Sequence, residues 1–258
     1  MIEQAATTRH PYVIRQLTVT RTTELSPGFV RVTLAGPELA GFTSFGPADH
    51  AKLFFTSAQS PETTLARDYT PRHYREATPT SVAELDVDFF RHSTAGAATS
   101  WLETVGAGST MAVGGPRGSR PVPSGISQVI IGVDETGLPA LARWIELLPE
   151  TVDIYAFVEL DDEADAAYLD PSHVNRARVV WLPKEEHGLE RALRGVGTIA
   201  DDCYVWCASE ATALVPVRRY LRRELDLPPS QARVVGYWKL GEAGRDHHAP
   251  VDPTDPVS

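Results

Sequence analysis

The sequence is poor in positive charge and has no long hydrophobic run. Its 258 residues carry 24 lysines and arginines against 34 aspartates and glutamates, a formal net charge of −10. Such a charge argues against a general affinity for nucleic acid or for an anionic membrane. No apolar run approaches the ~20 residues that span a bilayer, and the polar start, residues 1–10, lacks the apolar core of a signal peptide. We therefore expect a cytoplasmic protein with no membrane insertion.

Cysteines and clusters of metal ligands are also scarce. Only Cys203 and Cys207 occur, four residues apart in one apolar run. This spacing places them on one face of a strand but too far apart to form a disulfide. We interpret both as small buried apolar side chains. The adjacent His247 and His248 lack a third ligand, so we predict no metal site.

The first half of the chain is typical of a β domain. Short β segments alternate with turn signals such as Pro27-Gly28 and Gly36-Pro37, a pattern that favours a small barrel or sandwich. One helix, 95–105, interrupts them, and the Gly- and Pro-rich loop 114–118 closes the region. The predicted strands are 12–21, 28–35, 50–56, 67–74, 84–91 and 109–113.

The second half alternates strands with helices. Apolar strands with helical crossovers indicate a parallel sheet covered on both faces, whose ligands bind outside the carboxyl ends of the strands. The turn after the first of these strands is not G-x-G-x-x-G, so the standard dinucleotide fingerprint is absent. We predict domains at 1–123 and 124–241 and a disordered tail at 242–258. The predicted strands are 129–133, 152–160, 178–182, 204–208 and 233–238, and the helices are 138–148, 163–169, 189–194 and 211–225.

The stretch Arg67-Asp68-Tyr69-Thr70-Pro71-Arg72 contains the densest set of candidate ligand-binding groups. In a strand, Arg67 and Tyr69 share one face, and Thr70 and Arg72 share the other. A guanidinium binds pyrophosphate, an aromatic ring stacks on an isoalloxazine, and a hydroxyl donates to a ring nitrogen, so the stretch fits a flavin nucleotide. The alternative is a strand at a barrel rim with a surface arginine pair and a half-buried tyrosine.

A second candidate phosphate site lies at the start of the predicted helix 95–105. The small residues Gly96, Ala97 and Ala98 would let a ligand approach the first free backbone N–H groups, where the helix dipole favours an anion. The alternative is an ordinary helix start capped by Thr94, with Trp101 packed on the barrel.

Taken in order, these stretches resemble the siderophore-interacting proteins, which are flavin-dependent ferric-siderophore reductases of the ferredoxin–NADP reductase type. The resemblance spans residues 10–241 and implies an antiparallel Greek-key β-barrel that binds FAD, followed by a Rossmann-like α/β domain. The matching stretches are His50-Ala-Lys52-Leu-Phe-Phe, the hexapeptide from Arg67, His92 with residues 96–101, Gly115-Pro-Arg-Gly-Ser, Asp134-Glu-Thr136-Gly-Leu-Pro-Ala and Gly236-Tyr-Trp-Lys-Leu-Gly.

The resemblance also implies roles for individual residues. Arg67 would hold the FAD pyrophosphate, Tyr69 would lie on the isoalloxazine, Thr70 would bond near its N5, and Arg72 would sit close to the flavin or its phosphates. The other implied cofactor contacts are His92 and Gly96, Ala97, Ala98 and Thr99 at the phosphates, Asp134 and Thr136 at the nicotinamide, and Tyr237 and Trp238 over the flavin's other side.

The sequence leaves alternatives for the identity of the electron donor and for the type of reaction. NAD(P)H is the expected donor, although some relatives use ferredoxin, and Ser209 stands where the family commonly has glycine, which puts the nicotinamide partner in doubt. Acidic residues after the second α/β strand, Glu159, Asp161 and Asp162, would disfavour a 2′-phosphate bound as in a Rossmann site. The rival functions are a general NAD(P)H:flavin reductase or diaphorase and a non-enzymatic flavin-binding module.

An anionic ferric siderophore must approach this acidic protein through local positive charge. The chain has three lysines, Lys52, Lys184 and Lys239, and we predict that they dock the siderophore together with arginines such as Arg245. The alternative for each is a solvated surface amine. We expect a monomer.

Overall fold

The computed structural model describes residues 2–56, 64–92, 96–246 and 248–255. The chain divides into two compact units, Ala6–Pro121 and Met1–Ala5 with Val122–Ser258. The first five residues, which we expected in the first domain, therefore group with the second unit. Within the described ranges, no helix is long and apolar enough to cross a bilayer.

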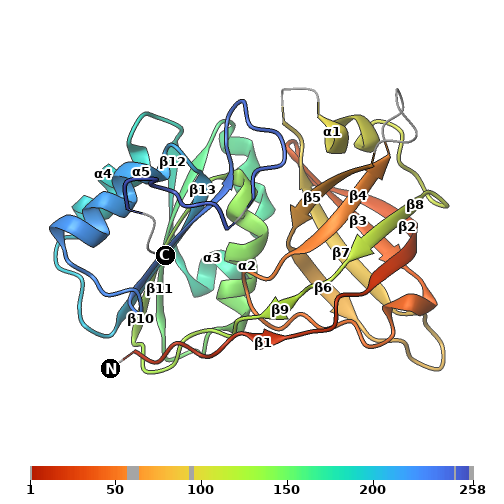
Figure 1. Cartoon of the computed structure of the whole chain (residues 1–258), viewed down its shortest axis with the longest axis horizontal. Coiled ribbons are helices and arrows are strands. Elements are labelled where there is room, and N and C mark those ends of the chain that lie inside the picture. Colours follow the sequence, from red (N-terminus) through yellow and green to blue (C-terminus); the bar gives the residue numbers. More distant parts are fainter. Residues whose placement is uncertain (1, 57–63, 93–95, 247, 256–258) are drawn as a thin grey trace. The chain divides into compact units, whose positions relative to one another are not determined.

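The unit Ala6–Pro121 is built on a seven-stranded antiparallel sheet in the order β5-β4-β8-β2-β3-β7-β6 (Figure 1). One short helix, α1 (Ala97–Leu102), and a 3₁₀ turn, η1 (Pro37–Leu39), accompany it, and the two-residue strands β1 (Thr8–Arg9) and β9 (Gly118–Ser119) pair separately. The strands of the sheet are β2 (Ile14–Ser26), β3 (Phe29–Ala35), β4 (Ala51–Thr56), β5 (Thr64–Tyr69), β6 (Pro71–Arg75), β7 (Glu84–Phe90) and β8 (Thr110–Gly114).

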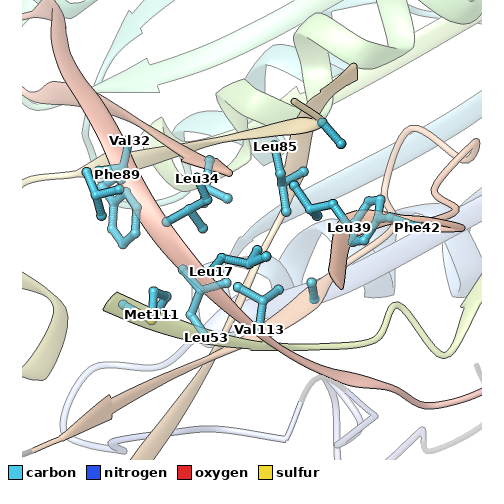
Figure 2. Close-up of a cluster of buried hydrophobic side chains, with 14 of the residues drawn as sticks. Leu17, Val32, Leu34, Leu39, Phe42, Leu53, Leu85, Phe89, Met111 and Val113 are labelled. Atoms are coloured by element: carbon cyan, nitrogen blue, oxygen red, sulfur yellow. The ribbon is translucent and has the colours of Figure 1, made fainter. Parts of the chain in front are cut away.

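Alternate residues of these strands fill the barrel core. Leu17, Val32, Leu53, Leu85 and Val113 come from five different strands and converge there (Figure 2). All five are at most 1% exposed. Period-two alternation of apolar residues therefore does position this core, as the sequence predicts.

The predicted strand 67–74 is wrong in one respect, because it is two strands. β5 pairs with β4, whereas β6 pairs with β7, and the chain changes partner at Thr70. The two edge strands of the sheet are thus consecutive in sequence. The partner change is a tertiary feature, and a register shift between Pro71 and His73 follows it.

The second unit contains a five-stranded parallel sheet in the order β12-β11-β10-β13-β14. Its strands are β10 (Gln128–Val133), β11 (Asp153–Leu160), β12 (Arg178–Pro183), β13 (Cys203–Glu210) and β14 (Ala232–Trp238). The connections contain η2 (Glu135–Gly137), α2 (Leu138–Leu147), η3 (Glu163–Tyr168), α3 (Pro171–Arg176), α4 (Gly188–Gly195), α5 (Leu214–Arg219) and a π-helical turn, η4 (Tyr220–Glu224).

The residues of β13 show how both faces of this sheet are covered. Cys203 and Cys207 pack in the cluster that contains Leu189 of α4 and Leu214 of α5. Trp206, on the opposite face, stacks on Trp144 of α2. The sequence interpretation of both cysteines as buried and unbridged is confirmed, and burial raises the pKa of each thiol to about 12.

The expected disordered tail is wrong for most of residues 242–255. Val251 is 8% exposed and packs in the core cluster beside α5. The Asp252 carboxylate accepts from Arg219 Nε at 2.7 Å and lies 3.4 Å from Arg223 Nη2. An acid- and proline-rich composition predicts disorder when the segment has no binding partner in the fold. Here the arginines of α5 and η4 bind the acidic segment and offset its negative charge.

Candidate functional site

Arg67 and Tyr69 lie on the inner face of the barrel sheet. They are directly opposite Leu53 and Ala51 of β4, and both of these partners are buried. Directly opposed residues of an antiparallel pair project to the same face, so Arg67 and Tyr69 share the core-facing side. Sequence alternation predicts that shared face.

The guanidinium of Arg67 is available to an anion. Its Nη1 donates to the carbonyl oxygen of Ala66 at 2.8 Å, and within the described ranges it forms no ion pair. A guanidinium held by a neutral carbonyl keeps its charge and several N–H donors for a phosphate. The other five candidate cations each lie within 4.0 Å of a carboxylate oxygen, namely Lys52, Arg72, Lys184, Lys239 and Arg245.

Tyr69 belongs to an aromatic cluster that joins three strands to α1. Its ring centroid lies 4.5 Å from that of Phe89 and 6.2 Å from that of Phe55. Trp101 of α1 packs on the same two rings, at 5.5 Å from Phe89 and 5.8 Å from Phe55. Burial raises the pKa of Tyr69, so the phenol stays neutral. The cluster holds the Tyr69 ring half-buried beside the helix.

The start of α1 has room for a ligand. Gly96 is the N-cap in extended conformation. Among the described residues no side chain caps the helix, and no atom beyond the chain neighbours of Gly96 lies within 4 Å of the place where a Cβ would stand. Ala97, Ala98 and Thr99 follow and are half-buried. The alternative cap, Thr94, and the expected first helical residue, Ala95, fall outside the described residues. Open space above uncapped N–H groups, with the unpaired charge of Arg67 in the same unit, fits the pyrophosphate of FAD.

The remaining candidate flavin residues have different surroundings. Thr70, 9% exposed, lies between β5 and β6, and His92 is exposed with its ring edge-on to Phe90 at 5.0 Å. Arg72 is 4% exposed, and its Nε lies 4.0 Å from the buried carboxylate of Asp88, which also accepts from Arg31 at 2.7 Å. A buried carboxylate requires cations close by, which accounts for the burial of Arg72. Its position close to the flavin or its phosphates stays a prediction.

At the carboxyl edge of the parallel sheet, Asp134 is the centre of a hydrogen-bond network. Its Oδ1 accepts from the amide and the hydroxyl of Thr136, at 2.9 and 2.5 Å. Its Oδ2 accepts from Ser209 Oγ at 3.0 Å, from the Glu210 amide at 3.2 Å and from Trp238 Nε1 at 2.8 Å. The structure therefore brings together residues predicted from three separate strand ends. Tyr237, next to Trp238, instead packs edge-on to Trp206 at 6.2 Å.

Lys184 is part of an acidic group at this edge. Its Nζ lies 3.0 Å from Glu135 Oε2, 3.3 Å from Asp161 Oδ2 and 5.6 Å from the centroid of the Trp238 ring. Burial alone would lower the pKa of Lys184, but the carboxylates of Asp134 and Glu135 outweigh it and raise that pKa. Because Glu135 is fully buried, Lys184 is held as its counter-ion. Its docking role stays a prediction.

Glu159 is a further acid of this edge. The residue is 3% exposed, and its Oε1 has no hydrogen-bond partner within the described structure. Burial, with the nearby charge of Asp134, raises the pKa of Glu159 to about 7. Sequence reasoning missed the interactions of Glu135 and Glu159. An acid at the end of an apolar strand does indicate a buried carboxylate, which is either paired with a cation or costly to ionise.

The other docking candidates also have partners. Lys52 Nζ lies 2.9 Å from Asp68 Oδ1, and Lys239 Nζ lies 3.1 Å from Glu242 Oε2. Both are exposed pairs, which contribute ~0–1 kcal/mol and are readily exchanged. Arg245 has a side chain only 6% exposed and donates to the carbonyls of Ala249 and Pro250. Docking roles for Lys52, Lys239 and Arg245 stay predictions.

The prediction that His247 and His248 form no metal site cannot be followed at His247, which falls outside the described ranges. Within those ranges no group of three or more metal-ligating side chains is found.

Comparison with known proteins agrees with this architecture. Residues 126–241 match the siderophore-interacting protein family, and residues 18–66 and 59–120 match the siderophore-interacting FAD-binding domain. The NADPH-dependent ferric-chelate reductase of Escherichia coli (strain K12) is 33% identical over 249 residues, covering 89% of this chain and 94% of that protein.

Solved structures extend the likeness to the fold. A siderophore utilization protein from T. fusca superposes with a TM-score of 0.85 at 30% identity, covering 95% of this chain and 99% of that one. The cytochrome b5 reductase domain of Ulva prolifera nitrate reductase has a TM-score of 0.65 at 13% identity, covering 86% and 97%, and shows the fold alone. The predicted fold class, an antiparallel barrel followed by a parallel α/β domain of the ferredoxin–NADP reductase type, is confirmed, and the chain belongs to the siderophore-interacting protein family.

Proposed function

We propose that the protein is an FAD-dependent oxidoreductase that reduces ferric iron held by a siderophore, and thereby releases it. Hard oxygen donors bind ferrous iron much more weakly than ferric iron, so reduction is sufficient for release. The ferric-chelate reductase relative supports the activity, and the match to an FAD-binding domain supports the cofactor.

The observation that carries the flavin assignment is the Arg67 guanidinium on the inner face of β5. It forms no ion pair within the described structure, in a chain where the other candidate cations are paired. We assign Arg67 to the FAD pyrophosphate, the open start of α1 at Gly96 to the same phosphates, and Tyr69 to the isoalloxazine. FAD supplies the transfer of electrons from a two-electron donor to a one-electron acceptor.

The protein's residues bind and orient rather than transfer protons. Tyr69 stays neutral because its pKa is raised, so it offers a ring face and a hydroxyl donor without adding charge beside the flavin. The aromatic cluster with Phe89 and Trp101 fixes that ring and links it to the helix that would meet the phosphates. The site thus needs no nucleophile or general base.

The proposed donor is NAD(P)H, as in the NADPH-dependent relative, with ferredoxin as the alternative. The proposal places the reaction in the cytoplasm, where NAD(P)H is available, in a monomer. A diaphorase and a non-enzymatic flavin-binding module remain the rival functions, since the same flavin site would serve each.

Anaerobic electron transfer separates these functions. The FAD-loaded protein is photoreduced and mixed with a ferric siderophore, with the matching gallium complex, or with a quinone. We expect rapid reoxidation by the ferric complex, appearance of ferrous iron in a ferrozine assay, and no reoxidation by gallium. Reoxidation by the quinone alone would establish a diaphorase, and failure of both NADH and NADPH to reduce the bound flavin would remove NAD(P)H as donor.

A further inference from the structure

The turn between β10 and α2 is where a standard dinucleotide fold binds pyrophosphate. In that fold, glycines let the phosphates approach the backbone N–H groups that open the first helix. Here the corresponding turn is Asp134-Glu135-Thr136-Gly137, and the sheet order around it, β12-β11-β10-β13-β14, is that of the first five strands of such a fold. The contacts of the turn decide whether it can accept a phosphate.

The backbone N–H groups of residues 136–138 already have acceptors inside the protein. The Thr136 amide donates to Asp134 Oδ1 at 2.9 Å. The Gly137 amide donates to the Asp134 carbonyl at 3.0 Å, and the Leu138 amide donates to the Glu135 carbonyl. These three donors are not left for a ligand.

The donors at the end of β13 are also occupied by Asp134. The Glu210 amide at the end of β13 donates to Asp134 Oδ2 at 3.2 Å, and the Ser209 hydroxyl donates to the same oxygen at 3.0 Å. Asp134 is fully buried, so its carboxylate is an internal anion that occupies the position of the missing phosphate. Ser209, where the family commonly has glycine, strengthens this closure.

The charge around the turn also opposes a phosphate. Glu135 and Glu159 are buried beside Asp134, and Asp161 lies at the next strand end. Lys184 is the cation of this group, and it is committed to Glu135 at 3.0 Å and Asp161 at 3.3 Å. A pyrophosphate here would meet several carboxylates of its own sign.

We propose that the Asp134 carboxylate closes the first turn of the α/β unit to phosphate, so that a nicotinamide nucleotide donor is recognised without the pyrophosphate anchor of a standard dinucleotide fold. This inference rests on the proposed function in naming the donor. It specifies one property of donor recognition: the closed turn makes no contact with the pyrophosphate of the donor.

The test uses the FAD-loaded protein, in which the flavin's own adenylate site is filled. Calorimetric titration with ADP-ribose and with inorganic pyrophosphate is expected to show no saturation at micromolar concentrations. NADPH is expected to reduce the flavin with a KM that added inorganic pyrophosphate does not raise. ADP-ribose that binds with a micromolar Kd and competes with NADH would overturn the proposal.

Two variants test the role of the carboxylate directly. Asp134→Gly frees the Thr136 and Glu210 amides and should gain at least tenfold in affinity for pyrophosphate. If that variant does not fold, Asp134→Asn keeps the side-chain volume and should gain affinity to a smaller degree. A folded variant of either kind with unchanged affinity contradicts the closure.

Asp49→Asn is the matched control. Asp49 is another buried carboxylate that accepts backbone and hydroxyl donors, from Gly46, Arg120, Ser44 and Ser119, but it lies in the barrel unit. It should lose stability without any change in pyrophosphate binding. The titrations need no ferric substrate. They therefore test the closure of the turn independently of the assay that tests the reductase activity.

Discussion

At the scale of single residues, Arg67 lacks an ion pair and Glu159 Oε1 lacks a hydrogen-bond donor in the described structure, and each has a measurable consequence. Arg67 is a half-buried cation without an ion pair in the described structure. Glu159 is a buried acid with one oxygen that lacks a donor there. An isolated buried charge is costly, so such groups are either ligand-binding or strained.

Arg67→Gln should release the flavin. A charged hydrogen bond to phosphate contributes ~1.5–3 kcal/mol, so the Kd for FAD should rise roughly 10- to 100-fold. The measurement is quenching of FAD fluorescence on titration of the apoprotein. Arg21→Gln, which removes an exposed arginine paired with Glu84 in the same unit, is the control and should leave the Kd unchanged. Equal affinities in both variants would reject the assigned role of Arg67.

Glu159→Gln should change how stability depends on pH. The pKa of Glu159 is raised from 4.5 to about 7 by burial. Between these values the folded protein holds a proton that the unfolded chain has lost, so the free energy of unfolding falls as pH rises from about 4.5 to 7. The variant removes that loss and should be more stable than the wild type at pH 8 by roughly 2–3 kcal/mol.

Denaturant unfolding of the FAD-loaded protein at pH 5 and pH 8 measures this difference. Glu150→Gln, a change at an exposed acid, is the control and should follow the wild-type profile. Parallel wild-type and Glu159→Gln profiles would mean that Glu159 ionises normally.

At the scale of elements, the C-terminal segment 249–255 acts as a strap across α5 and η4. Asp252→Asn should lower the Tm and make it less sensitive to salt, because the ion pairs to Arg219 and Arg223 are lost. The same charge change at the exposed Asp201 should have little effect.

Val251→Ala should cost roughly 1–2 kcal/mol, because the side chain is buried in the cluster beside α5. Differential scanning calorimetry would detect this loss. A Val251→Ala protein with the wild-type Tm would show that the strap is not part of the folded unit.

The element scale also shows where sequence reasoning works and where it fails. Apolar periodicity predicts the strands of both sheets, because each buried face must repeat every second residue. It fails at Thr70, where the hydrogen-bond partner changes from β4 to β7. It fails again at Lys184 and Asp252, whose counter-ions, Glu135 and Arg219, are 49 and 33 residues away in sequence. Pairings of this kind are decided by tertiary structure.

At the scale of the whole molecule, a net charge of −10 opposes the approach of an anionic chelate. Lys239 is paired with Glu242 in an exposed contact at 3.1 Å. Lys239→Gln should raise the KM for an anionic ferric siderophore, and Glu242→Gln, which releases the lysine, should lower it. Both effects should fade when salt shortens the Debye length to ~8 Å.

Steady-state kinetics at low and physiological ionic strength measure this, with a neutral quinone as the control acceptor and FAD content as a check. Shifts of the same sign in both variants, or equal shifts with the neutral acceptor, would show that Lys239 does not guide the siderophore.

The assignment of residues 1–5 to the second unit has a consequence for the backbone itself. Thr8 pairs with Ser119, and Glu3 bridges to Ser124 in the same antiparallel register, so the chain passes between the units along two neighbouring stretches instead of one. A single cut near residue 122 would therefore leave the N-terminal fragment bound to the second unit through residues 1–5. Proteolytic nicking there, followed by gel filtration without denaturant, should give one peak with both fragments, and two peaks would show that residues 1–5 do not hold the fragments together.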